Sequence, residues 1–173
     1  MTDTAAYIGE ACRFYVMLVL FAAAIGKLGA VRAFQGTLEA VVGVTGPWSR
    51  VASFAVHALE GGVGTHLLAG GDVARIAMMI AAALFVVFAA MISTVLARRL
   101  PVACNCFGGV SHVISGFDLA RNASLLAASA LYFAQPAQVG SFSVIGLVMM
   151  FGVAVITAIL SVRLSDLVFL THR

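Results

Sequence analysis

One uncharged stretch limits how this chain can fold more than any other feature. Residues 122–162 contain no Asp, Glu, Lys or Arg. A helix needs about 20 apolar residues to cross the hydrocarbon core of a bilayer, so this stretch is long enough for two crossings. The rest of the chain agrees, because 62% of its 173 residues are hydrophobic and only 10% are charged. Soluble domains carry roughly a quarter charged residues, and we therefore expect lipid to be the main solvent.

Turn-forming residues divide the apolar sequence into segments. Gln135 to Gln138, which include Pro136, separate the uncharged stretch into two arms. Three further apolar segments precede it, and Pro47 stands at the start of the second. The sequence predicts an all-α integral membrane protein, a single domain over residues 1–173 with four to five transmembrane helices. Five are preferred, and four are the alternative because the segment before Gln135 is short. The expected spans are 9–30, 48–70, 76–97, 119–134 and 142–162.

The basic residues predict the orientation of these spans. Lys and Arg concentrate on the cytoplasmic side of membrane proteins, and five spans place most of them on one face. This pattern predicts a multi-pass protein of the inner (plasma) membrane, with its N-terminus outside and its C-terminus in the cytoplasm. That face holds Lys27, Arg32, Arg50, Arg98, Arg99, Arg121, Arg163 and Arg173, and the other holds Arg13 and Arg75.

The positive net charge does not indicate nucleic-acid binding. The formal net charge is +3, but the basic residues are scattered singly between apolar runs. A nucleic-acid-binding protein needs a basic stripe or an aromatic stacking platform, and neither is present in the sequence. The lipid bilayer is therefore the partner that the composition predicts.

A pair of cysteines follows the third expected span. Cys104 and Cys106 lie in the segment Pro-Val-Ala-Cys-Asn-Cys-Phe-Gly-Gly over residues 101–109. Two thiols one residue apart can close a small, strained disulfide ring, and strained exposed disulfides are labile. Arg98 and Arg99, a few residues upstream, favour the reactive thiolate. The pair therefore indicates redox or metal chemistry, whereas the lone Cys12 is better explained as a packed small side chain.

Ionisable residues within the expected spans are further candidates. His57 and Glu60 lie three residues apart in the second span and hence on one helix face. Such groups are costly in a membrane unless paired. They fit a proton relay, the wall of a quinone pocket, or a structural hydrogen-bonded pair. No cofactor is certain, and quinone is the candidate. We expect Lys27 to extend to the membrane surface, with a counter-charge for Glu60 as the alternative.

The cysteine motif resembles that of a known family. A Cys-x-Cys-Phe-Gly sequence after a third hydrophobic segment, with an Arg-Asn pair opening the next, is similar to the MauE family of methylamine-utilisation membrane proteins. Its wider relatives are the DoxX-like redox-associated membrane proteins. Lys27 resembles a basic residue at the end of that family's first span, and Glu60 resembles an acidic residue in its second. The motif residues here are Cys104, Cys106, Phe107, Gly108, Arg121 and Asn122.

The resemblance implies a process rather than a defined reaction. Members of this family are expected to serve the maturation or export of the light subunit of methylamine dehydrogenase, a disulfide-rich periplasmic quinoprotein. The implied partners are a thioredoxin-like protein and this exported, disulfide-containing client. The resemblance also adds Arg121 and Asn122 to His57, Glu60 and Lys27 as accessory site residues.

Three functional classes stay open from the sequence. The leading hypothesis is a membrane thiol–disulfide oxidoreductase in which Cys104 and Cys106 are the catalytic residues. The second is a protein that handles Cu(I) or Zn(II), because thiolates suit both ions. Only His112 stands near the pair as a further ligand, so we expect no resident metal site. The third is a non-catalytic structural membrane subunit.

The orientation leads to a first testable prediction. A reporter fused after Arg173 should be active only in the cytoplasm, because most basic residues fall on that face. The measurement compares reporters that work on opposite sides of the membrane. Activity of an externally active reporter at this position would rule out the five-span arrangement in favour of four spans.

Overall fold

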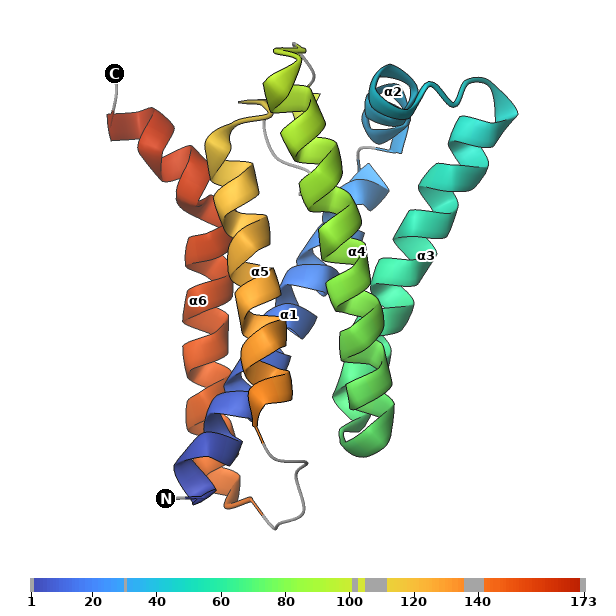
Figure 1. Ribbon diagram of the computed structural model, residues 1–173. Coiled ribbons are helices and arrows are strands. Elements are labelled where there is room, and N and C mark those ends of the chain that lie inside the picture. The colour runs from blue at the N-terminus through green and yellow to red at the C-terminus, as the bar shows by residue number, and fades with distance from the viewer. Residues whose placement is uncertain (1, 30, 101–102, 105–111, 136–141, 172–173) are drawn as a thin grey trace.

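The computed structural model describes residues 2–29, 31–100, 103–104, 112–135 and 142–171 (Figure 1). Within these ranges the chain forms six helices and one short antiparallel hairpin. The two strands of the hairpin are β1 (Ala103–Cys104) and β2 (His112–Val113). The helices are α1 (Thr2–Gly29), α2 (Val31–Val42), α3 (Pro47–Ala69), α4 (Gly71–Ala97), α5 (Gly116–Ala134) and α6 (Val144–Thr171).

The five long helices, α1, α3, α4, α5 and α6, overlap the five segments that the sequence marks as spans. Within the described residues, three helical stretches are long and apolar enough to cross a membrane: Thr4–Gly29, Gly71–Ala97 and Val144–Arg163. α3 and α5 are more polar, since α3 contains Arg50, His57 and Glu60 and α5 begins with Asp118 and Arg121. The predicted helical class is confirmed together with these three apolar helices, and the number of crossings stays a prediction.

α2 is the helix that the sequence did not predict. Its apolar side chains Phe34 and Leu38 lie one turn apart and are buried, whereas Arg32 and Glu39 are exposed. This spacing gives the helix one apolar face and one polar face. In Figure 1, α2 lies across one end of the bundle, between the end of α1 and the start of α3. It therefore covers the space between these helices instead of continuing through the bundle.

Local sequence signals set the helix boundaries. Pro47 occupies the first turn of α3, where its missing N–H costs nothing. Gly70 and Gly71 have φ angles of 73° and 56°, a conformation that favours glycine, and they make the tight turn into α4. α5 begins with a capping box in which the Ser115 N–H donates to Asp118 Oδ2 at 2.9 Å.

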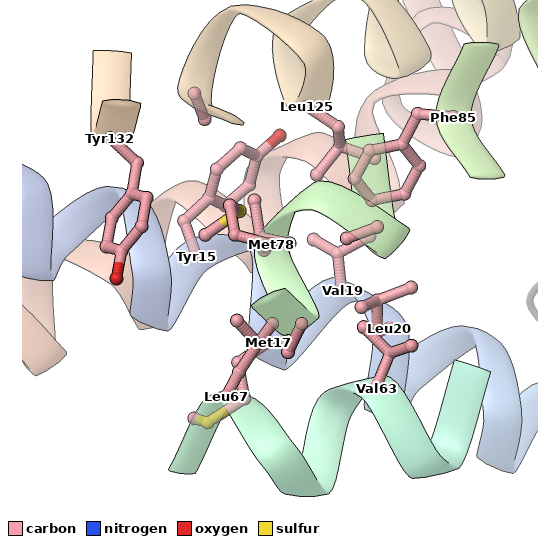
Figure 2. Close-up of a cluster of buried hydrophobic side chains, with 14 of the residues drawn as sticks. Tyr15, Met17, Val19, Leu20, Val63, Leu67, Met78, Phe85, Leu125 and Tyr132 are labelled. Carbon is pink, nitrogen blue, oxygen red and sulfur yellow. The ribbon is translucent and has the colours of Figure 1, made fainter. Parts of the chain in front are cut away.

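α1 is the central helix of the bundle. It packs against α3, α5 and α6, while α4 packs against α3 and α5 (Figure 1). Figure 2 shows the core they enclose, with side chains from α1, α3, α4 and α5 pointing toward one another. The labelled core residues are Tyr15, Met17, Val19, Leu20, Val63, Leu67, Met78, Phe85, Leu125 and Tyr132.

The outside of the bundle is unusually apolar. Val144, Ile145 and Val148 of α6 are each at least 65% exposed, and Val86 and Val87 of α4 are 57% and 62% exposed. Soluble monomers rarely expose contiguous apolar surface on this scale. Such a surface is stable in lipid, in agreement with the three apolar helices.

The two ends of the bundle differ in charge. α1 and α4 end, and α3 and α5 begin, at the end that carries α2 and the hairpin, which we call the hairpin end (Figure 1). The N-terminus and the Gly70 turn lie at the opposite end. Arg173 lies outside the described residues. Helix positions place Lys27, Arg32, Arg50, Arg98, Arg99, Arg121 and Arg163 toward the hairpin end, and Arg13 and Arg75 toward the other.

The contact between α1 and α6 gives a second prediction. A Cβ added at Gly146 would come within 2.5 Å of the Tyr7 ring, and the ring is held by an edge contact with Phe142 and by the Ser143 N–H, 3.2 Å from the Tyr7 hydroxyl oxygen. Gly146→Ala should therefore lower the free energy of unfolding by about 1–3 kcal/mol. Reversible unfolding in mixed detergent micelles measures it.

Gly152→Ala is the matched control on the same helix, because no atom lies within 4 Å of a Cβ added there. Combining Gly146→Ala with Tyr7→Ala should remove most of the cost that Gly146→Ala adds. Equal stability of the two glycine variants would contradict this packing of α1 against α6.

Candidate functional site

A small cavity lies inside the bundle, beneath α2 and between α1, α4 and α5. Its volume is about 40 Å³, which is room for a few water molecules. Four of the five accessory residues expected from the sequence line it, and only His57 does not. The lining residues are Val19, Leu20, Ala23, Lys27, Thr37, Glu60, Phe85, Phe88, Met91, Ile92, Ile114, Arg121, Asn122 and Leu125.

A buried ion pair forms one wall of the cavity. Lys27 Nζ on α1 donates to Glu60 Oε1 on α3, and the two residues are only 2% and 1% exposed. The ammonium also lies 4.8 Å from the centre of the Phe34 ring and 5.3 Å from that of Phe88, where the electron-rich ring faces stabilise a cation. The expectation that Lys27 extends to the membrane surface is wrong, because α2 covers it. The alternative, a counter-charge for Glu60, is what the structure has.

His57 does not form the hydrogen-bonded pair with Glu60 that the sequence offered as one explanation. His57 Nδ1 and Glu60 Oε2 are both buried, and neither has a hydrogen-bond partner among the described residues. Glu60 instead uses its other oxygen to bind Lys27. Glu60, which lines the cavity, therefore has one carboxylate oxygen that is not used in the ion pair.

α5 contributes polar side chains from its first two turns. Arg121 pairs with Asp118 at 3.1 Å, and Asp118 is fully buried in the capping box. Asn122 Nδ2 donates to the Phe85 carbonyl oxygen at 2.6 Å, a bond that fixes α5 to α4. The Arg-Asn pair of the motif thus holds the helix that follows the cysteine loop in position.

The cysteine motif joins the bundle at the same place. Cys104 lies in β1, and its backbone partner in the antiparallel hairpin is His112. β1 packs against α2, and Ile114, just after β2, lines the cavity. Cys106 lies outside the described residues, and of Cys104 only the backbone is described. The described residues contain no group of three or more Cys, His, Asp or Glu side chains that could hold a metal ion.

A second buried ion pair lies at the opposite end of the bundle, and the sequence analysis missed it. Arg13 Nε donates to Glu10 Oε2 at 2.9 Å, and a second Arg13 nitrogen donates to the Leu67 carbonyl oxygen near the end of α3. The i, i+3 spacing of Glu10 and Arg13 was the available signal. Cys12 lies between them in sequence, is half-buried and packs against the core, as expected for a small side chain.

The Lys27–Glu60 pair gives a third prediction. Removing one member leaves an uncompensated charge inside the bundle, so Lys27→Met and Glu60→Gln should each cost about 3–5 kcal/mol of stability. The double variant should cost much less than the sum, because it leaves no buried charge. Unfolding free energies in mixed micelles complete this cycle.

The control is Arg32→Met, an exposed basic residue on α2, which should change stability by no more than about 0.5 kcal/mol. Strictly additive costs for Lys27→Met and Glu60→Gln would mean that the two side chains do not interact.

The comparisons with known proteins agree with the motif. Searches of curated proteins and of solved structures gave no match. The family described as methylamine utilisation protein MauE matches residues 5–135, which is more than half of the 173 residues. The matched range contains Lys27, Glu60, the Cys-x-Cys motif and the Arg-Asn pair, and it ends just after α5. The chain belongs to the MauE family, as its Cys-x-Cys-Phe-Gly sequence indicated.

Proposed function

We propose that this protein exchanges thiols and disulfides at a membrane, with Cys104 and Cys106 as the reactive pair, during maturation of an exported disulfide-rich protein. The family is named for methylamine utilisation, and the client we propose is the light subunit of methylamine dehydrogenase. The observation that carries the proposal is the attachment of the cysteine loop. The hairpin that contains Cys104 packs on α2 and continues into the wall of a buried, charged cavity.

The proposed exchange follows the usual two-step chemistry. The thiolate of one cysteine attacks a sulfur of a partner's disulfide, a mixed disulfide forms, and the partner's other sulfur leaves as a thiolate. The second cysteine then attacks the mixed disulfide and releases the reduced partner. Two electrons pass from the pair to the partner, and the reverse sequence oxidises a partner dithiol. A thioredoxin-like protein suits either direction.

The end of α4 places two arginines a few residues before the cysteine pair in the sequence. Arg98 caps α4, and Arg99 adopts the left-handed conformation with a φ of 51°, so the chain leaves the helix in a sharp turn. Both side chains are exposed. Two positive charges a few residues before Cys104 favour the thiolate over the thiol, and the thiolate is the form that attacks a disulfide.

The proposal includes the arrangement in the membrane. We infer five crossings in the inner membrane, with the hairpin end on the cytoplasmic side. The basic residues gathered at that end support this orientation. Glu60 of α3 and Asp118 of α5 are buried in ion pairs, which reduces the cost of placing these charges in lipid. Quinone stays the candidate cofactor, and the cavity, with a volume of about 40 Å³, is room for a few water molecules.

The test of the proposed function is a pair of cysteine variants. Cys104→Ser and Cys106→Ser should each abolish client maturation while the protein still accumulates in the membrane, because exchange needs one sulfur to attack and one to resolve. The variant that lacks the resolving thiol should retain a covalent complex with its partner, seen as a thiol-sensitive band on a non-reducing gel.

Cys12→Ser is the matched control and should leave maturation unchanged, since Cys12 belongs to α1 toward the other end of the bundle. Normal maturation in both loop variants would reject thiol exchange and favour a structural subunit. Maturation that follows copper or zinc supply, without any trapped complex, would favour metal handling.

A further inference from the structure

Glu60 lines the cavity and has one carboxylate oxygen without a partner among the described residues. Its Oε1 accepts from Lys27, while Oε2 is buried and has no partner among the described residues. A buried acceptor without a hydrogen bond is costly. A cavity needs roughly 10–15 Å³ to hold one water, and this one measures about 40 Å³. Water is therefore the donor that fits both the space and the free oxygen.

On α3, a line of two buried hydroxyl groups lies between Glu60 and the hairpin end. Ser49, Ser53 and Glu60 share one face of α3, since they are separated by four and seven residues. Their exposed fractions are only 2%, 4% and 1%. Ser49 Oγ donates to Glu39 Oε1 of α2 at 2.7 Å, and Glu39 is exposed. A rise of 1.5 Å per residue makes this line roughly 16 Å long.

α2 packs beside this line of hydroxyl groups on α3. Thr37 of α2 is 4% exposed and lines the cavity together with Glu60, and α2 packs against α3. The buried hydroxyls of both helices therefore lie along one contact. We call this contact, made by Ser49 and Ser53 of α3 and Thr37 of α2, the polar seam.

The groups around Glu60 come from every helix that packs on the cavity. α1 contributes Lys27, the ion-pair partner, and α5 contributes Arg121, which is paired with Asp118. His57 lies one turn before Glu60 on α3 itself. The residues that line the cavity from α4 are all apolar: Phe85, Phe88, Met91 and Ile92.

Protonation of Glu60 would leave the Lys27 ammonium with other stabilising contacts. The Lys27 ammonium keeps the faces of Phe34 and Phe88, and its N–H groups can turn to cavity water. Protonation of Glu60 therefore breaks the ion pair at a smaller cost in stability than removal of the carboxyl group would cause.

We propose that the cavity is a hydrated proton-exchange site, with Glu60 as the proton acceptor and the polar seam as its route to solvent at the hairpin end. The inference rests on the proposed function in one respect, the use of the proton. Before the attack, the proton of the thiol moves through water to the Glu60 carboxylate, and the thiolate so formed attacks the partner's disulfide. Glu60 then gives this proton to the partner's leaving thiolate and ends, as it began, as a carboxylate.

Infrared difference spectra of the purified full chain in nanodiscs test the site without any client. Acidification should produce carbonyl absorption from protonated carboxylic acids, shifted in D₂O, and Glu60→Gln should lack one band of it. Glu10→Gln is the control, because Glu10 belongs to the other buried ion pair, and it should keep the band. If Glu60→Gln does not fold, Lys27→Met/Glu60→Gln replaces it. If a folded variant without the Glu60 carboxyl group keeps this band unchanged, Glu60 is not the proton acceptor and the proposed proton-exchange site is rejected.

The route has a test of its own. Ser53→Ala removes a hydroxyl from the polar seam while leaving the ion pair in place, and it should slow the H/D exchange of the Glu60 band at least about tenfold. Ser129→Ala is the matched control, since Ser129 is equally buried but bonds the Leu125 carbonyl oxygen within α5. Exchange at the wild-type rate in Ser53→Ala would reject the polar seam as the route.

The link to thiol chemistry is measured by the pH dependence of exchange with a reduced or oxidised thioredoxin. Variants without the Glu60 carboxyl should exchange about a hundredfold more slowly, the lower range for a lost general base, and should lose one step of the pH profile. An unchanged profile overturns this role even if the band is present. If Cys104→Ser and Cys106→Ser both mature the client normally, the proposed function fails while the infrared result still decides on the proton site.

Discussion

The ion pair between Lys27 and Glu60 is the interaction on which the hairpin end of the molecule depends. Two charges inside a bundle with a lipid-facing exterior are stable only when they meet each other. Their contact joins α1 to α3, and α2 covers it with the Phe34 ring. α2 also packs on β1, the strand that contains Cys104. The position of this strand therefore depends, through α2, on the Lys27–Glu60 ion pair.

This arrangement connects the two parts of the sequence that looked functional for separate reasons. The cysteine motif follows α4 and the charged pair joins α1 to α3, yet Ile114, just after the hairpin, lines the same cavity as Lys27 and Glu60. Asn122 fixes α5 to the Phe85 carbonyl oxygen of α4. The helices on both sides of the cysteine loop are thus held together, so that the loop starts and ends on a rigid frame. Rigid support is what a reactive pair needs for a defined approach of its partner.

The sequence predicted most of the fold, since bilayer thickness sets the length of an apolar helix and the long apolar runs follow it. It missed α2 because that helix is short and amphipathic, and its apolar residues become meaningful only against α1 and α3. The expectation that Lys27 extends to the membrane surface was wrong for the same reason. Nothing near Lys27 in the sequence shows that Phe34 of α2 covers its ammonium group. Glu60 was identified as a candidate from its depth in the span. Its partner lies 33 residues away, a distance that local spacing does not reveal.

The proposed function depends on Cys104 and Cys106 forming a redox couple. The most direct measurement equilibrates the Cys12→Ser protein in nanodiscs with glutathione buffers of graded potential and counts alkylated thiols by mass spectrometry. Both thiols should disappear together in a single two-electron transition, with a labile disulfide that glutathione can reduce. Two cysteines that stay alkylated at every potential, or that react independently of one another, would contradict it.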